Sequence, residues 1–140
     1  MFNRPFFLPL TAKSADLYDP ISPSGKDDAM GIIKSSEVIQ EVIGKSRTRH
    51  LAHLSNLMMV AIDFEDGPAS QPDPPHSHPH EQISYVVSGE INVVLGDEVT
   101  HLSPGDIFTV PANLPHSIQP LSPKVRLIDA FSPIREEFLK

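Results

Sequence analysis

The residues best suited to chemistry are three closely spaced histidines, His76, His78 and His80, which follow a proline-rich stretch and precede an apolar run. In an extended chain, residues two apart project to the same side, so His76 and His78 can direct their imidazoles at one point. His116, which opens a later apolar run, can supply another nitrogen. Because neutral imidazole is the commonest protein ligand for first-row metal ions, this spacing predicts a metal site rather than a histidine-rich surface loop.

Two residues are candidates for a further ligand of this site. Gln82 stands at the start of the next apolar run and brings an amide oxygen to the same side if the extended phase continues. His80 continues the alternating spacing and is the competing ligand. The chain has no cysteine, so nitrogen and oxygen atoms must hold the ion, which leaves Zn, Ni, Mn, Fe and Co as candidates.

Short runs rich in Val, Ile, Leu and Phe are the elements that must position these residues. The predicted strands are 38–43, 48–54, 57–64, 83–87, 91–95, 106–110, 116–119 and 125–131. About eight short strands separated by turn residues predict an all-β antiparallel sandwich or barrel. The 15 prolines in 140 residues argue against a helical bundle, and only 136–140 is predicted to form a short helical turn.

Length and composition limit the class of protein. A chain of 140 residues without an internal repeat predicts one barrel domain, 31–140, preceded by a proline-rich N-terminal arm, 1–30. The net charge of -7 disfavours a protein that binds nucleic-acid phosphates. No apolar run is long enough for a signal peptide or a transmembrane helix, and the lack of cysteine fits a reducing compartment, so we expect a cytoplasmic protein without membrane partners.

Two stretches of the sequence resemble the paired motifs of the cupin family. The first cupin motif has the form G-x5-H-x-H-x3–4-E-x6-G. Its later positions are matched by His76, His78, Gln82 and Gly89, while Ser70 stands where the motif opens with glycine. The match therefore includes both histidines, and it replaces the acid of the motif with the amide of Gln82.

The second cupin motif, G-x5-P-x-G-x2-H-x3-N, is matched by Gly105, Pro111 and His116. Asn113 replaces its middle glycine, and Pro120 replaces its final asparagine. The resemblance spans about residues 40–135, and the spacing of the two motifs makes it specific.

By this resemblance the protein is a single-domain cupin, a jelly-roll β-barrel with a divalent metal ion inside. The implied ligands are His76, His78, Gln82 and His116. A neutral amide ligand leaves the ion its full +2 charge, which favours a Lewis-acid role. The resemblance and the proline-rich arm also imply a homodimer.

Asp129 is the candidate general acid or base. Side chains alternate between the two faces of a strand, so in the predicted strand 125–131 Asp129 shares one face with Val125, Leu127 and Phe131. A carboxylate on an apolar strand face is costly to bury, so its position indicates an acid or base facing the metal. The alternative is a structural aspartate paired with Arg135.

Residues 129–139 resemble the C-terminal signature of small cupins related to the bacterial pectin-degradation protein that turns unsaturated monouronates into linear keto sugars. In those proteins a D-x-F-x3-R pattern lines the substrate cavity, and it is matched here by Asp129, Phe131 and Arg135. The resemblance implies that Asp129 moves a proton and that Arg135 binds a substrate carboxylate. Phe131 is either a wall of the cavity or plain core.

Arg47 and Arg49 alternate around Thr48 in another predicted strand. They face either an anionic substrate in the cavity or the exterior of the barrel. We expect the exterior, because charged side chains are seldom buried without a partner.

The residues and the resemblance together predict a metal-dependent enzyme for a small oxygenated, anionic, sugar-acid-like molecule. Its expected chemistry is isomerisation, ketonisation or a lyase reaction, with the metal as Lewis acid. The alternatives are a non-catalytic cupin that binds or senses a metabolite, an iron-dependent dioxygenase, and a metal-stabilised structural domain. The expected partners are a small-molecule substrate and a second copy of the chain, with no nucleic acid.

Overall fold

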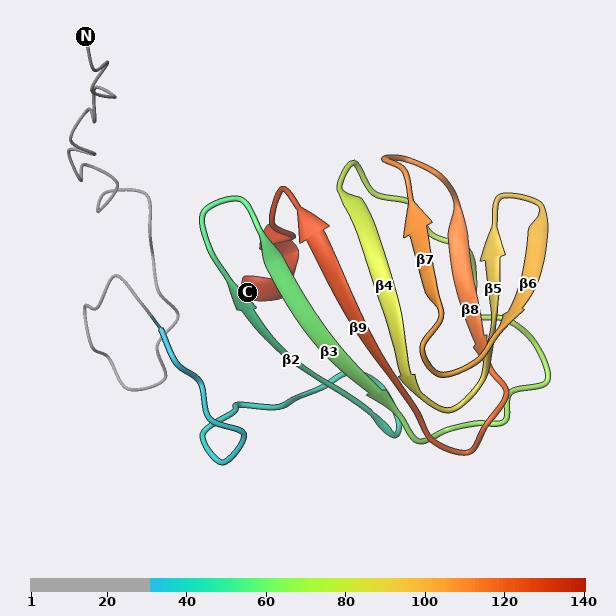
Figure 1. Cartoon of the computed structure of the whole chain (residues 1–140), viewed down its shortest axis with the longest axis horizontal. Helices are drawn as coiled ribbons and strands as arrows, with labels where there is room; N and C mark the ends of the chain where they lie inside the picture. The colour runs from blue at the N-terminus through green and yellow to red at the C-terminus, as the bar shows by residue number, and fades with distance from the viewer. Residues whose placement is uncertain (1–30) are drawn as a thin grey trace, which may run out of the picture.

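Figure 1 shows the computed structural model, which describes residues 31–140 as an almost entirely β protein. The strands of this part of the chain are β1 (Glu41–Val42), β2 (Arg47–His53), β3 (Met58–Phe64), β4 (Glu81–Ser88), β5 (Ile91–Leu95), β6 (Glu98–Leu102), β7 (Ile107–Val110), β8 (His116–Pro120) and β9 (Val125–Ser132). A 3₁₀ turn, η2 (Glu136–Leu139), follows the last strand. No helix within residues 31–140 has the length and hydropathy needed to cross a bilayer. The predicted N-terminal arm, 1–30, lies outside the described residues.

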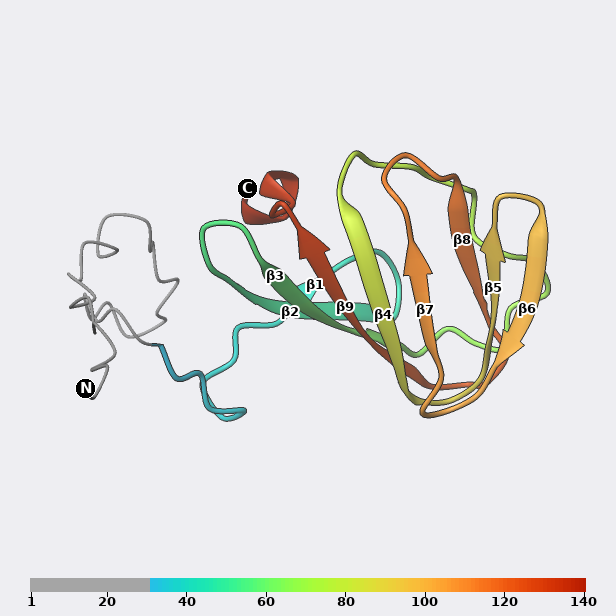
Figure 2. The ribbon, with the colours of Figure 1, turned by 45° about the horizontal axis from the view of Figure 1, so that its top comes forward.

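The strands form two antiparallel sheets. One has six strands in the order β1-β2-β3-β9-β4-β7, and the other has three in the order β6-β5-β8. Figure 2 shows the smaller sheet beyond the β7 edge of the larger one, with the strands of both wrapping around a common interior. The predicted all-β jelly-roll barrel is confirmed.

Each of the eight predicted strand segments overlaps a strand of the structure, and the predicted C-terminal turn is η2. No strand was predicted at β6, whose residues are exposed or half-buried throughout. This strand lies at the edge of the smaller sheet and, within residues 31–140, pairs with β5 alone. No face of β6 is buried, so no hydrophobic period marks it in the sequence.

The core lies between the two sheets. Its largest cluster joins side chains of the six-stranded sheet to side chains of β5: Phe64, Val86, Phe108, Val110, Val125, Leu127, Ile91 and Val93. The inner faces of β4 and β9 also carry three buried polar residues, Gln82, Ser84 and Asp129. Asp129 shares the buried face of β9 with its apolar neighbours, which confirms the predicted phase. The two central strands therefore direct polar groups into an otherwise apolar interior.

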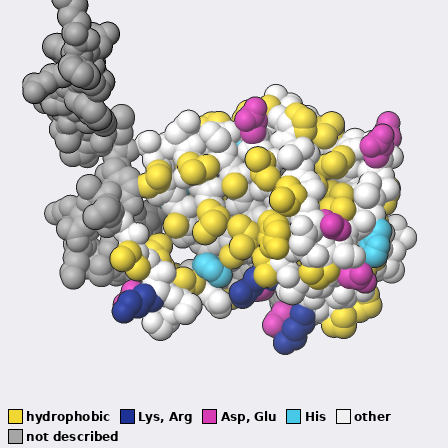
Figure 3. Space-filling model, viewed as in Figure 1, with side chains coloured by type: hydrophobic (Ala, Val, Ile, Leu, Met, Phe, Trp, Pro, Cys, Tyr) yellow, Lys and Arg dark blue, Asp and Glu magenta, His cyan; other side chains and the backbone are white. Residues whose placement is uncertain are grey.

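The outer face of the six-stranded sheet is apolar over neighbouring strands. Met59 of β3, Ile83 and Tyr85 of β4 and Ile107 of β7 are exposed there, and we call these four residues the outer apolar patch. Tyr85 lies directly opposite Ile107 in the β4–β7 pair, and Ala130 of β9 lies between Met59 and Ile83. Figure 3 shows hydrophobic side chains gathered over these strands. The larger sheet thus has two apolar faces, of which only one is covered within the described residues.

Gly89, between β4 and β5, is a point where the fold has no room for a side chain. Its φ is +76°, and a Cβ would overlap the carbonyl oxygen of Lys124. Gly44 has a similar φ of +73°, but nothing lies within 4 Å of its Cβ position. We expect Gly44→Ala to cost about 1 kcal/mol for the left-handed backbone. Gly89→Ala should cost about 1–3 kcal/mol more, because backbone atoms must move.

Urea unfolding of the two glycine variants measures this difference in the free energy of unfolding. Equal losses for Gly89→Ala and Gly44→Ala would show that the close approach of Lys124 does not constrain the turn.

Candidate metal centre and active site

A backbone pairing brings the separated histidines together. His76 and His116 form an isolated antiparallel bridge, in which each amide N–H donates to the other's carbonyl, at 3.0 and 2.9 Å. The loop before β4 is thereby held against the start of β8, and the two rings have centroids 4.3 Å apart. Ligand nitrogens of His76, His78 and His116 all lie within 4.8 Å of one another. This histidine trio can hold a metal ion.

The hydrogen bonds of two rings leave the correct nitrogens free for a metal. Nδ1 of His78 lies 3.0 Å from the carbonyl oxygen of His80, and Nδ1 of His116 lies 2.8 Å from that of Leu114. A carbonyl oxygen only accepts, so each Nδ1 carries the ring proton and each Nε2 keeps its lone pair. Nε2 of His116 is buried and has no hydrogen-bond partner among residues 31–140. Such an orphaned lone pair fits a metal ligand.

Gln82, near the start of β4, lies beside the trio. Its Oε1 is 3.1 Å from Nε2 of His78. Both atoms are acceptors when Nδ1 of His78 carries the proton, so a cation between them would relieve their repulsion. His80, the competing ligand, is not a member of the trio, and its carbonyl oxygen instead holds the ring of His78. The donor set of three imidazoles and one amide oxygen fits a divalent first-row ion.

The trio is uncharged at neutral pH. Burial, reinforced by His116, His78 and Arg135, lowers the pKa of His76 to about 4. Burial is also the main cause of the lowered pKa values of His78 and His116. All three rings are therefore in the neutral form that binds metals, and an ion does not have to displace protons from them at pH 7.

Asp129 is buried on β9, where the Ser84 hydroxyl donates to its Oδ1 at 2.5 Å. Burial raises the pKa of Asp129 to about 6, against the lowering effects of the Ser84 hydrogen bond and of Arg135. Among the ion pairs of residues 31–140, Arg135 pairs with Glu137, through Nε at 2.8 Å, and not with Asp129, so the alternative of a structural ion pair between Asp129 and Arg135 is wrong. A carboxyl group with a pKa near neutrality can both accept and release a proton.

Most of the predicted site residues line one cavity of about 270 Å³: His76, Gln82, His116, Asp129, Phe131 and Arg135. His78 lies just behind this lining, with its ring edge-on to Phe131 at 5.7 Å between centroids. Phe131 therefore forms a wall of the cavity and also packs in the core. The cavity has room for one small molecule beside the trio.

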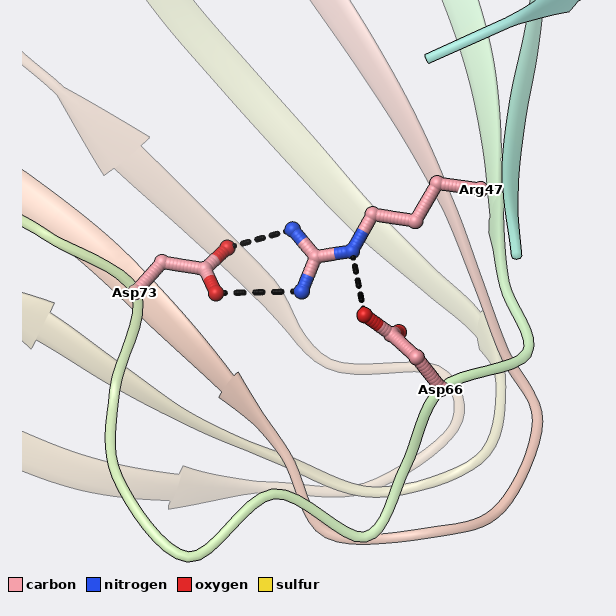
Figure 4. Close-up of polar contacts among 3 residues, drawn as sticks. All are labelled: Arg47, Asp66 and Asp73. Atoms are coloured by element: carbon pink, nitrogen blue, oxygen red, sulfur yellow. Dashed lines mark hydrogen bonds and ion pairs between the residues drawn. The ribbon is translucent and has the colours of Figure 1, made fainter. Parts of the chain in front are cut away.

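Arg47 and Arg49 line the same cavity, so the expectation that they face the exterior is wrong. The expectation assumed charged groups without partners, but the fold supplies acids for both. Arg47 holds Asp73 through both terminal nitrogens, at 2.6 and 3.0 Å, and Asp66 through Nε at 2.9 Å (Figure 4). Because Asp73 lies shortly before His76 in the chain, these bonds also tie β2 to the loop that carries His76 and His78.

The C-terminal turn completes the cavity wall. The guanidinium groups of Arg49 and Arg135 stack on the ring of Phe138, at 3.9 and 4.2 Å from its centroid. Each arginine is held through Nε, by Glu41 and by Glu137 respectively, so these ion pairs do not engage its terminal amino groups. The guanidinium groups of Arg49 and Arg135 therefore give the cavity two positive charges that can bind an anionic ligand.

Besides Arg47 and Arg49, two further residues of the site were not predicted from the sequence, Ser84 and Phe138. Ser84 follows Gln82 by two positions, so the alternation that identified Gln82 also indicates that Ser84 lies on the inner face of the strand. Phe138 lies in the predicted C-terminal turn, but no local pattern indicates that this turn packs on an arginine from β2 and on the arginine that immediately precedes the turn.

The chain resembles known proteins over most of its described length. The family model described as "Cupin domain" matches residues 63–129. The pectin degradation protein KdgF of Dickeya dadantii (strain 3937) is 39% identical over 85 residues, which are 60% of this chain and 74% of that protein.

Solved structures with this fold are also similar in sequence. An RmlC-like cupin from Shewanella frigidimarina NCIMB 400 superposes with a TM-score of 0.71 at 33% identity, covering 79% of this chain and 96% of that one. KdgF from Halomonas sp. gives a TM-score of 0.71 at 33% identity, covering 78% of this chain and 98% of that one. The two motifs, the barrel and these relatives together show that the chain belongs to the cupin family.

Proposed function

We propose that the protein is a cytoplasmic, metal-dependent enzyme that isomerises a small sugar-acid-like anion, with ketonisation of an unsaturated uronate as the specific reaction. The observation that carries this proposal is the position of Asp129. This buried carboxyl group has a pKa near neutrality and lines the same cavity as His76, His116 and Arg135. Similarity to two proteins named KdgF, one of which is described by its role in pectin degradation, supports the choice of substrate class.

The proposed metal ligands are His76, His78, Gln82 and His116. The lone pairs on Nε2 of His78 and His116, and the amide oxygen of Gln82, support this assignment. A divalent ion held there would supply Lewis-acid polarisation of a substrate oxygen. Zn, Ni, Mn, Fe and Co all suit nitrogen and oxygen donors, so we assign no single metal.

Two side chains of the cavity, Arg135 and Asp129, would act on the substrate. The terminal amino groups of Arg135 would bind its carboxylate, while Phe131 and Phe138 fix the position of the guanidinium by stacking at 5.1 and 4.2 Å. Asp129 would carry the proton. Ketonisation removes a proton from the hemiacetal hydroxyl, opens the ring C–O bond and adds a proton to the alkene carbon, so the reaction balances without an oxidant. A single carboxyl group that accepts and then releases a proton is sufficient for this transfer.

Substitution of Asp129 tests the proton-transfer role. We expect Asp129→Asn to lower kcat by about 10²–10⁴-fold with little change in KM, because the amide cannot accept the proton. The assay is the loss of ultraviolet absorbance as the conjugated alkene of an unsaturated uronate is consumed, with metal content measured in parallel. Unchanged turnover by Asp129→Asn would remove Asp129 from the mechanism. Binding without turnover by the natural sequence would indicate a sensing cupin, and oxygen consumption with iron would indicate a dioxygenase.

Substitution of Arg135 tests carboxylate binding. Arg135→Gln should raise KM by roughly 10–100-fold, the effect of losing a charged hydrogen bond to the substrate. Arg126→Gln is the matched control, because Arg126 pairs with Asp63 and does not line the cavity. Equal effects of the two substitutions on KM would contradict the assignment.

Loss of one histidine tests the metal centre. We expect His116→Ala to weaken binding of the ion by at least about 100-fold, since it removes a ligand rather than an outer contact. His101→Ala should leave metal affinity unchanged, because His101 is exposed on β6. Competition with a chelator measures both dissociation constants, and an ion bound equally well by both variants would show that His116 is not a ligand.

We propose that two copies pair through the outer apolar patch as a homodimer. A net charge of -7 on each chain opposes association, so the contact requires a surface without charge, and none of the four patch residues is charged. A twofold arrangement would bury the same patch on both copies.

A charge placed in the patch tests the dimer. Ile107→Glu should convert dimers to monomers, whereas Val99→Glu on the smaller sheet should not. The two residues are matched because each is 61% exposed. Light scattering gives the mass in solution, and a natural chain that is monomeric, or an Ile107→Glu variant that stays dimeric, would contradict this interface.

A further inference from the structure

A chain of buried hydrogen bonds joins the metal centre to Asp129 through Ser84. Oε1 of Gln82 faces Nε2 of His78 at 3.1 Å. Nε2 of Gln82 donates to the Ser84 hydroxyl at 2.9 Å, and this hydroxyl donates to Oδ1 of Asp129 at 2.5 Å. Gln82, Ser84 and Asp129 are all buried, so water cannot replace a missing partner easily.

The direction of this chain follows from the number of protons available. A serine hydroxyl has one proton to donate, and a carboxylate can only accept. The Ser84 proton is committed to Asp129, so the oxygen of Ser84 must accept its other hydrogen bond from the NH₂ group of Gln82. The amide of Gln82 then has one allowed orientation, with its oxygen turned toward His78.

The sheet fixes this arrangement. Ser84 lies directly opposite Asp129 in the β4–β9 pair, and Gln82 lies opposite Phe131 two positions away. Gln82 and Ser84 share the inner face of β4, so the strand register sets the spacing of all three polar groups. Ser84 is fully buried, so solvent does not reach the hydroxyl that joins Gln82 to Asp129.

We propose that Ser84 is a positioning residue: it uses the negative charge of Asp129 to hold the Gln82 amide with its oxygen, rather than its nitrogen, toward the metal. This inference rests on the proposed metal centre. It also explains why an amide, and not the acid of the cupin motif, occupies position 82. A glutamate there would place a second carboxylate on Ser84, whose single proton can satisfy only one of the two.

Metal affinity in four proteins tests the positioning role: the natural sequence, Ser84→Ala, Gln82→Glu and the double variant. We expect Ser84→Ala to weaken Zn²⁺ or Mn²⁺ binding by about 10–100-fold when residue 82 is Gln, because the amide is then free to turn its nitrogen to the ion. In the Gln82→Glu background, Ser84→Ala should weaken metal binding by less than about threefold. A carboxylate presents an oxygen to the ion in either orientation, so its direction no longer matters. Chelator competition gives the dissociation constants.

The two backgrounds separate positioning from a packing defect. An equal loss on Ser84→Ala in both backgrounds, or no loss with Gln82, would overturn the proposal. If the natural sequence binds neither ion, the proposed metal centre fails, and the direction of the hydrogen-bond chain is then tested by stability alone.

The stability test uses metal-free protein. Gln82→Glu should lower the melting temperature by about 5 °C or more, because one buried carboxylate lacks a donor. Adding Asp129→Asn should restore most of this loss, since the introduced amide can donate to Ser84 and Ser84 can donate to the introduced carboxylate. If the change in melting temperature of the double variant equals the sum of the changes in the two single variants, Ser84 does not couple these sites.

Discussion

The backbone bridge between His76 and His116 is the interaction on which the rest of the site depends. It joins the loop before β4 to the start of β8, and so to the smaller sheet. Arg47 supports the same loop from β2 through Asp73 and Asp66. The protein's own backbone and ion pairs therefore hold the trio together, and an entering ion does not have to order the loop.

The interior combines neutral side chains that could bind a metal ion with one ionisable acid. Burial keeps the trio uncharged, and Gln82 adds an oxygen without adding charge. Asp129 is the buried carboxyl group of this interior, and Ser84 stands between it and Gln82. Arg49 and Arg135 place positive charge at the wall formed with the C-terminal turn, where the proposed anionic substrate would bind. In the proposed function, metal binding, proton transfer and substrate binding would therefore fall to separate groups in one cavity.

Features set by local spacing could be predicted from the sequence. The alternation of side chains along 125–131 predicted that Asp129 lies on the inner face of its strand. The spacing of the two motifs predicted that His116 lies near His76 and His78, and the structure places the residues in this way. Features set by contacts between distant segments could not. The partners of Arg47 and Arg49 lie on other elements, the stacking on Phe138 requires the C-terminal turn to fold back, and β6 has no buried face to mark it.

The position of the metal is the most direct test of the account. Crystals grown with the bound ion and measured at its absorption edge would give an anomalous peak that marks it. We predict one peak per chain, in contact with His76, His78, His116 and Oε1 of Gln82, with Asp129 facing the same cavity. A peak bound by His80 in place of Gln82, or located outside the barrel, would contradict the proposed centre.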